Sequence, residues 1–249
     1  MIKTLKTRLR IILTKLLGKD FSSPSLTRLV RDSQVISFDV FDTLIIRTVP
    51  LPTDVFNLIH PEDPTFKSRR IEAERQARKL SPLEDIKLEE IYKELYDDPC
   101  ERQEAMDLEI STELSVCKAN PEALEFFNTV RKDGKRVVIV SDMYLSASTI
   151  ERILINCGYD LNGVNLYVSS EYGKTKRSGN LFKEVLKALR VESVSAPTVK
   201  RREKSESCEG ADSVKGKDVL HIGDNYISDY LMPRKCGMKG FLYNRLSQS

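Results

Sequence analysis

The sequence is short of the residues that build metal clusters, disulfide frameworks and membrane spans. It has no tryptophan, two histidines, and five scattered cysteines that form no C-x-x-C pair. The few histidines argue against a histidine-based metal cluster. The cysteine pattern fits neither a disulfide framework nor a zinc site, which favours the reducing cytosol. No run approaches the roughly 20 apolar residues that span a bilayer, and the basic start lacks the cleavage site of a signal peptide.

The chain also lacks a strong charge of one sign. Its 249 residues include 40 Lys and Arg against 37 Asp and Glu, which leaves a net charge of +3. A dedicated nucleic-acid-binding protein usually concentrates far more positive charge, so we expect no nucleic-acid partner. The length and a hydrophobic fraction of 40% suit a globular protein with one sizeable core and a smaller inserted domain.

Residues 1–20 carry apolar side chains at helical spacing, from Ile2 to Leu17, with lysines and arginines between them. This pattern predicts a basic amphipathic helix that ends near Gly18. Such a helix can lie on an anionic membrane surface, contact a partner protein, or pack on the body of its own chain. The sequence leaves these alternatives open.

Beyond a short serine-rich linker, predicted strands and helices alternate along the chain. We expect strands at 35–38, 136–140, 166–169 and 218–222, and helices at 121–131, 146–157 and 181–189. Strands that alternate with helices imply an α/β fold with a doubly wound parallel sheet. Residues 190–217, rich in Ser, Lys, Arg and Glu, predict a flexible loop.

A second kind of pattern interrupts this alternation directly after the first strand. Helical periodicity predicts helices at 66–80, 88–95 and 104–116. We therefore expect an all-helical domain at 50–128, inserted into an α/β core that comprises residues 21–49 and 129–249.

Three of the predicted strands end in polar residues, namely Asp39, Ser141 and Asp224. The carboxyl ends of parallel strands line the ligand crevice of an open sheet, so these groups should meet in space. A carboxylate such as Asp39 can attack phosphorus and form an aspartyl-phosphate. Asp224 and Asp229, together with Asp39, would hold Mg²⁺ through oxygen ligands. Lys176 would add positive charge, and Ser141 a hydroxyl donor to a phosphoryl oxygen.

This set resembles the four motifs of the haloacid dehalogenase (HAD) superfamily, whose members are mostly phosphatases. The first motif reads Asp39-Val40-Phe41-Asp42-Thr43, the second matches Ser141, and the fourth matches Asp224 and Asp229. The third is best matched by Lys176, with Lys174 as a rival. The resemblance covers about residues 35–245. It implies a Rossmann-like HAD core and a helical cap that closes over the site.

The resemblance also implies a role for each motif residue. The catalytic positions are Asp39, Asp42, Ser141 and Lys176, and the positions of the Mg²⁺ site are Asp39, Phe41, Asp224 and Asp229. The candidate substrate contacts are Thr43, Asp142 and Asn225, for which a local turn or cap role is the alternative. His221, inside an apolar run, is expected to be a packed strand residue.

One position departs from the phosphatase pattern. Phe41 stands two residues after the nucleophile, where family phosphatases carry their general acid and family dehalogenases have a non-acidic residue. Asp42, one position later, would reach the leaving oxygen as general acid and base, or would only cap the turn after the strand. The sequence predicts a Mg²⁺-dependent phosphatase or phosphotransferase, with a dehalogenase-like hydrolase as the alternative.

Three segments, Phe38–Leu44, Val140–Leu145 and Ser169–Gly173, resemble a bacterial HAD subgroup associated with glycosyltransferases and surface-polysaccharide assembly. This resemblance implies a small phosphorylated metabolite, such as a sugar or polyol phosphate, as substrate. The basic helix predicted at 1–20 would fit a cytosolic enzyme that contacts the inner membrane face or a glycosyltransferase complex. A catalytically weak scaffold within such an assembly is the third hypothesis.

Overall fold

The computed structural model describes residues 16–195 and 214–244. Five parallel strands form the main sheet in the order β5-β4-β1-β6-β7. Their bounds are Val35–Phe38 for β1, Arg136–Ser141 for β4, Asn165–Val168 for β5, Val219–Gly223 for β6 and Lys239–Leu242 for β7. The central strand β1 lies between β4 and β6, with Phe38 opposite Ile139 and Ile222. The predicted doubly wound α/β core is confirmed.

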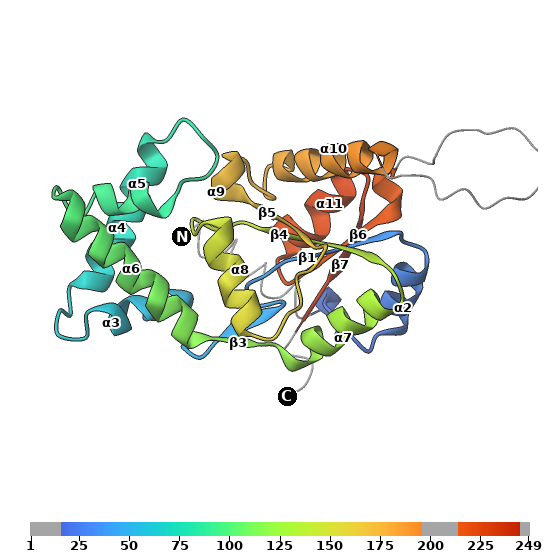
Figure 1. The fold of residues 1–249 in the computed structure, drawn as a ribbon, viewed down its shortest axis with the longest axis horizontal. Coiled ribbons are helices and arrows are strands. Elements are labelled where there is room, and N and C mark those ends of the chain that lie inside the picture. Colours follow the sequence, from blue (N-terminus) through green and yellow to red (C-terminus); the bar gives the residue numbers. More distant parts are fainter. Residues whose placement is uncertain (1–15, 196–213, 245–249) are drawn as a thin grey trace, which may run out of the picture.

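Helices cover both faces of this sheet (Figure 1). One face carries α2 (Pro24–Arg31), α7 (Pro121–Lys132) and α8 (Ala147–Asn156), and the other carries α10 (Asn180–Ser195) and α11 (Met232–Lys235). Successive side chains of a strand point to opposite faces. Accordingly, Ile36 and Phe38 join the cluster under α7 and α8, whereas Val35 joins the cluster under α10. The sheet is therefore buried on both sides.

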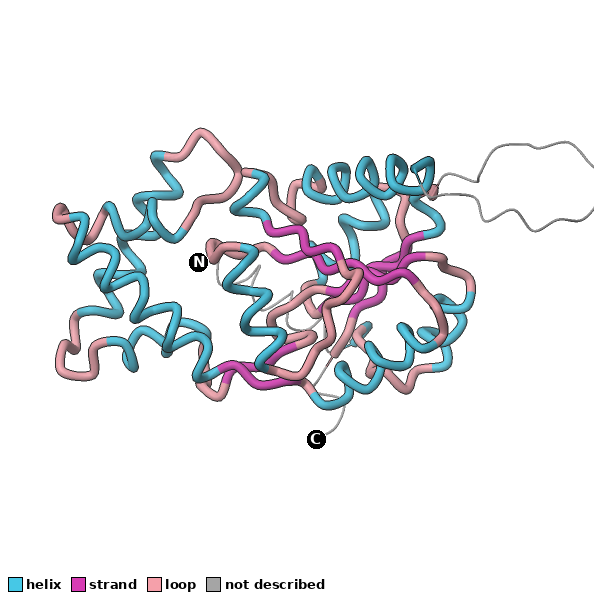
Figure 2. The backbone as a smooth tube through the Cα atoms, in the orientation of Figure 1, coloured by secondary structure: helices cyan, strands magenta, loops and turns pink. Residues whose placement is uncertain are grey.

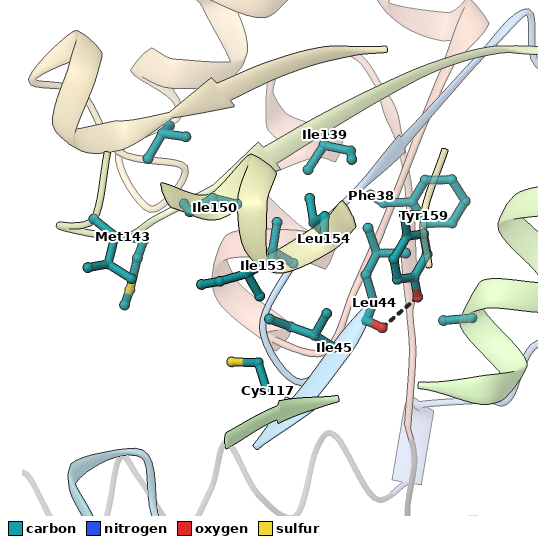
Figure 3. Packing of buried hydrophobic residues seen from close by; sticks show 14 of the residues in the cluster. Phe38, Leu44, Ile45, Cys117, Ile139, Met143, Ile150, Ile153, Leu154 and Tyr159 are labelled. Carbon is teal, nitrogen blue, oxygen red and sulfur yellow. Dashed lines mark hydrogen bonds between the residues drawn. The ribbon is translucent and has the colours of Figure 1, made fainter. Parts of the chain in front are cut away.

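The turn that follows β1 is anchored by the neighbouring core. Tyr159 donates its hydroxyl to the carbonyl oxygen of Leu44 at 2.6 Å, beside the apolar cluster of Phe38 and Leu154 (Figure 3). The carboxamide of Asn120 donates to the carbonyl oxygen of Thr43 at 2.8 Å, and its main-chain N–H donates to that of Leu44 at 2.8 Å. These contacts fix the backbone immediately after the predicted nucleophile.

The insertion after β1 is a helical cap. It contains η1 (Pro52–Val55), α3 (Phe56–Ile59), α4 (Phe66–Leu80), α5 (Leu88–Lys93) and α6 (Pro99–Val116). Two short antiparallel strands, β2 (Ile45–Arg47) and β3 (Cys117–Ala119), connect this cap to the core (Figure 2). Phe127 of α7 packs on Phe38 with ring centroids 5.7 Å apart, so α7 belongs to the core. The cap therefore ends near Val116 rather than at residue 128.

A buried ion pair organises the interior of the cap. Arg70 of α4 donates two hydrogen bonds to Glu109 of α6, at 2.7 and 2.8 Å, and the Tyr92 hydroxyl donates to Glu109 at 2.7 Å. The Arg70 and Glu109 side chains are both 0% exposed. The rings of Phe56 and Tyr144 lie 4.7 and 4.9 Å from the Arg70 guanidinium. Because Tyr144 belongs to the core, this cluster also joins the cap to the core.

Several elements differ from the sequence expectations. Residues 24–31 form α2 instead of a linker, since Pro24 suits the first turn of a helix. Strand β7 was not predicted, and α10 continues to Ser195, beyond the expected start of the loop at residue 190. Most of the helix predicted at 1–20 lies outside the described residues, and Lys19 pairs with Tyr243 in a β-bridge instead. Within the described ranges, no helix is long and apolar enough to cross a membrane.

Replacing Arg70 with Met should lower the free energy of unfolding by about 3–5 kcal/mol, because Glu109 would remain as a buried charge without its partner. The matched control is Arg75→Met on the same helix, which removes an exposed ion pair with Glu72. That change should cost about 1 kcal/mol or less. Urea denaturation measures both variants, and equal stabilities would contradict the structural role of Arg70.

Candidate active site

The carboxyl ends of β1, β4 and β6 bring Asp39, Ser141 and Asp224 to one edge of the sheet. Lys176, in the loop between α9 (Ser169–Tyr172) and α10, extends its ammonium into this edge. Its Nζ donates to Asp39 Oδ1 at 2.5 Å and to Asp229 Oδ1 at 2.7 Å. Asp39, Asp229 and Lys176 are all buried.

The structure distinguishes between the two candidate lysines of the third motif. Lys174 forms an ion pair with Glu184 of α10, away from the acids. Lys176 contacts the predicted nucleophile directly. The geometry therefore puts Lys176, and not Lys174, beside Asp39.

Three acids converge in the manner of a metal site. Asp39, Asp224 and Asp229 each offer a carboxylate oxygen, and these oxygens lie within 4.8 Å of one another. Asp229 comes from the π-helix η3 (Tyr226–Leu231) directly after β6. A Cβ at Gly223 would lie 2.5 Å from Asp229 Cγ, so only glycine permits this approach. Carboxylate oxygens at such spacing suit a hard cation such as Mg²⁺.

The acids also perturb one another. Burial, with repulsion from Asp229, raises the pKa of Asp39 to about 7 against the attraction of Lys176. Burial, followed by repulsion from Asp39 and Asp229, raises the pKa of Asp224 well above its usual range. Although burial opposes it, the Lys176 ammonium holds the pKa of Asp229 below its usual range. Full ionisation of all three acids at neutral pH therefore requires positive charge beyond that of Lys176.

Ser141 has a buried hydroxyl without a hydrogen-bond partner among the described residues. Its side chain is 1% exposed, and no group among the described residues hydrogen-bonds to its Oγ. An unsatisfied buried hydroxyl costs about 1–3 kcal/mol. The orphaned hydroxyl at the carboxyl end of β4 thus suits a bound oxygen acceptor.

The predicted substrate contacts are engaged with the protein. Thr43 Oγ1 donates to Asp39 Oδ2 at 3.2 Å. Asp142 Oδ1 accepts the Lys176 main-chain N–H at 2.7 Å. The Asn225 carboxamide oxygen caps η3 by accepting two main-chain N–H groups. These contacts orient Asp39, the lysine loop and the helix that carries Asp229.

Phe41 and Asp42 have different surroundings. The Arg47 guanidinium covers the Phe41 ring at the base of the cap, with Arg47 Cζ 4.2 Å from the ring centroid. A metal contact at this position would have to come from the main-chain oxygen of Phe41. Asp42 is exposed, with φ of 60°, a left-handed conformation that Asp tolerates better than most residues. Repulsion from Asp42 contributes to the raised pKa of Asp224, after burial and repulsion from Asp39 and Asp229.

His221 is a packed residue of β6, as predicted, and its ring also contacts the acid cluster, which the strand pattern did not indicate. Its Nε2 lies 3.2 Å from Asp229 Oδ1, and its Nδ1 lies 2.7 Å from Ser37 Oγ. Burial lowers the pKa of His221, against the attraction of Asp229. The signal in the sequence is a histidine inside a buried apolar strand, because both ring nitrogens then need partners.

Comparison with known proteins relates the chain to one family and one fold. The profile of haloacid dehalogenase-like hydrolases matches residues 34–237. A 2-haloacid dehalogenase from Pseudomonas syringae pv. Tomato shares the fold at 15% identity, covering 87% of this chain and 89% of that chain, with a TM-score of 0.52. No functionally curated protein matches the sequence significantly.

Two further solved structures share the fold at similar distance. YfnB of Bacillus subtilis, described as a HAD hydrolase and solved with bound magnesium, is 13% identical over 83% of this chain and 86% of that chain, with a TM-score of 0.52. A HAD family enzyme from Bacteroides thetaiotaomicron is 13% identical over 84% of this chain and 93% of that chain, with a TM-score of 0.53. At these identities the likeness concerns the fold alone.

Mg²⁺ should raise the melting temperature of the protein, because a cation that binds the folded acid cluster stabilises the fold by about 2.7 kcal/mol at 100 times its Kd. Asp224→Asn should lose most of this shift. Glu125→Gln, which removes an exposed acid on α7, should keep it. Thermal melts with Mg²⁺ and with EDTA measure the effect. The same shift in all three proteins would place the metal elsewhere.

Proposed function

Since the chain belongs to the haloacid dehalogenase-like hydrolase family, we propose that it is a Mg²⁺-dependent phosphatase or phosphotransferase that acts through Asp39. Its substrate would be a small phosphorylated metabolite. The observation that supports this most is the convergence of Asp39, Asp224 and Asp229 around one point. Such a cluster, next to a single hydrogen-bonded ammonium, suits the neutralisation of a phosphate dianion.

Each residue has a chemical task in this proposal. Asp39 attacks phosphorus, the bond to the leaving oxygen breaks, and water then hydrolyses the aspartyl-phosphate to release inorganic phosphate. Lys176 stabilises the negative charge of the phosphoryl group, and Ser141 donates its hydroxyl to a phosphoryl oxygen. Asp42 gives a proton to the leaving oxygen and later takes one from the attacking water.

Mg²⁺ would be held by Asp39, Asp224 and Asp229, with the main-chain oxygen of Phe41 as a further donor. When bound, it supplies the positive charge that lets a carboxylate and a phosphate dianion approach each other. The raised pKa of Asp39, to about 7, is the reason such charge matters, since a protonated carboxyl is a poor nucleophile.

A dehalogenase-like hydrolase is the second candidate. It is favoured by Phe41 at the acid position and by the shared fold of a 2-haloacid dehalogenase. Displacement of halide from carbon has no phosphate dianion to neutralise, so this reaction gives the three converging acids no task. The acid cluster therefore favours phosphoryl transfer. Halide release that persists in EDTA is the outcome that would reverse this preference.

The finer assignment rests on the three segments that resemble the polysaccharide-associated subgroup. A sugar or polyol phosphate as substrate, and a place in surface-polysaccharide assembly, are thus part of the proposal. Contact with the inner membrane face or a glycosyltransferase complex would involve residues 1–20, of which 1–15 lie outside the described residues. The scaffold hypothesis would be favoured by loss of membrane association on deleting this segment, together with no turnover on a panel of phosphorylated metabolites.

Asp39→Asn should abolish Mg²⁺-dependent hydrolysis of p-nitrophenyl phosphate, with a fall in kcat of at least about 1,000-fold, because the amide cannot form the acyl phosphate. Glu125→Gln is again the matched control, with full activity expected. Activity that survives in Asp39→Asn would contradict the assigned nucleophile.

The loss of activity in Asp42→Asn should depend on the leaving group of the substrate. On glycerol phosphate, whose alkoxide needs a proton, kcat/KM should fall by about 100- to 10,000-fold. On p-nitrophenyl phosphate, whose phenolate leaves unprotonated, kcat/KM should be much less affected. This ratio reports the first step and not the later hydrolysis of the aspartyl-phosphate, so equal falls in kcat/KM on both substrates would remove Asp42 from the role of general acid.

A further inference from the structure

The cap touches the core through the segment 81–87, which joins α4 to α5. Figure 1 shows this connection reaching toward α9. The main-chain N–H of Glu84 donates to the Gly173 carbonyl oxygen at 3.1 Å. Gly173 has φ of 60°, and a Cβ there would lie 2.9 Å from Leu83 Cδ1. The cap segment is therefore seated directly on the start of the loop that carries Lys176.

Glu84 binds this loop with its side chain. Its carboxylate accepts the main-chain N–H of Thr175 at 2.8 Å, the Ser178 hydroxyl at 2.5 Å and the Asn180 carboxamide at 2.5 Å. These three donors surround Lys176 in the sequence. Thr175 is its immediate neighbour, so the contact lies one peptide unit from the residue that contacts Asp39.

Asp85, the next residue, binds the other core loop of the site. Its buried carboxylate accepts the Ser169 hydroxyl and a hydrogen bond from Arg78 of the cap. Ser169 Oγ in turn accepts the main-chain N–H of Met143 at 2.8 Å. Met143 follows Asp142, whose carboxylate accepts the main-chain N–H of Lys176. Two adjacent cap acids thus hold both loops that fix the lysine.

We propose that Glu84 is a positioning residue for Lys176, which links the docked cap to the placement of the ammonium between Asp39 and Asp229. The hydrogen bonds from Thr175, Ser178 and Asn180 to the Glu84 carboxylate hold the backbone of residues 173–180. Lys176 lies in this loop, so the position of the loop determines where its ammonium meets Asp39. Without the Glu84 carboxylate, the donors of Thr175, Ser178 and Asn180 lose this acceptor. The effect on turnover rests on the proposed function, whereas the ordering of the loop does not.

The test compares Glu84→Ala with Lys87→Ala. Lys87 also makes a cap-to-core contact, an exposed ion pair with Glu171 at 3.9 Å, but on α9 and away from the Lys176 loop. Hydrogen–deuterium exchange of residues 173–180, measured without substrate, should rise about tenfold in Glu84→Ala and stay unchanged in Lys87→Ala. With Mg²⁺ and p-nitrophenyl phosphate, kcat should fall by about 10- to 100-fold in Glu84→Ala with KM changed less than about threefold.

Glu84→Gln supplies the conservative rescue. Its amide oxygen can still accept from Thr175 and Ser178, so exchange and kcat should return most of the way to the wild-type values. Wild-type exchange in Glu84→Ala, a rise in exchange with unchanged kcat, or an equal effect of Lys87→Ala would overturn the inference. If the wild-type protein hydrolyses no phosphate ester, the proposed function fails, and the exchange comparison alone then decides whether Glu84 orders the loop.

Discussion

The arrangement of the site depends on one buried ammonium. Lys176 lies between the carboxylates of Asp39 and Asp229, with hydrogen bonds of 2.5 and 2.7 Å. Its main-chain N–H is held by Asp142 from the end of β4, and Asp229 is oriented by His221 and by the main-chain N–H of Asn225. Removal of the charge would leave buried acids facing one another, which costs several kcal/mol.

A buried group of acids of this kind is poor evidence of a stabilising role. Desolvation of each carboxylate is expensive, and apolar residues of similar size would usually fold at least as well. The raised pKa values of Asp39 and Asp224 have the same cause, because burial disfavours the charged form of each carboxyl group. The proposed chemistry explains the cluster better than stability does. Three oxygen donors near an ammonium, and a Ser141 hydroxyl that no described residue binds, suit the proposed phosphate substrate and its cation.

The cap and the site are mechanically joined at several levels. The β2–β3 pair carries the Arg47–Glu113 ion pair at the base of the cap, and Arg47 also covers the Phe41 ring. Farther from the β2–β3 pair in the sequence, the Arg70 guanidinium of α4 lies over the ring of Tyr144, which belongs to the core. The segment with Glu84 and Asp85 then reaches the loops next to Asp39. The β2–β3 pair thus connects the cap to the first motif, and the segment 81–87 connects it to the loop of the third motif.

The sequence alone determined the central strands, the edge of the sheet that carries the site, and the presence of the cap. Short, mostly apolar runs predicted β1, β4 and β6, because a strand with both faces covered is largely apolar. The rule that parallel strands present their carboxyl ends together then brought Asp39, Ser141 and Asp224 to one edge without any coordinates. Helical spacing predicted the cap. These features depend on short-range periodicity and on chain order, which a sequence states directly.

Only the tertiary structure decided the rest. The sequence favours Lys176 over its rival Lys174 without excluding the latter, and the path of their loop separates them. His221 is the packed strand residue that the sequence predicted, and the structure adds that its ring nitrogens contact Ser37 and Asp229. Two of the four residues of β7 are Lys239 and Gly240, which weaken the strand pattern. Glu84 lies 91 residues before Thr175, its hydrogen-bond donor. Contacts between such distant segments depend on how loops and domains pack, and local residue patterns do not encode that.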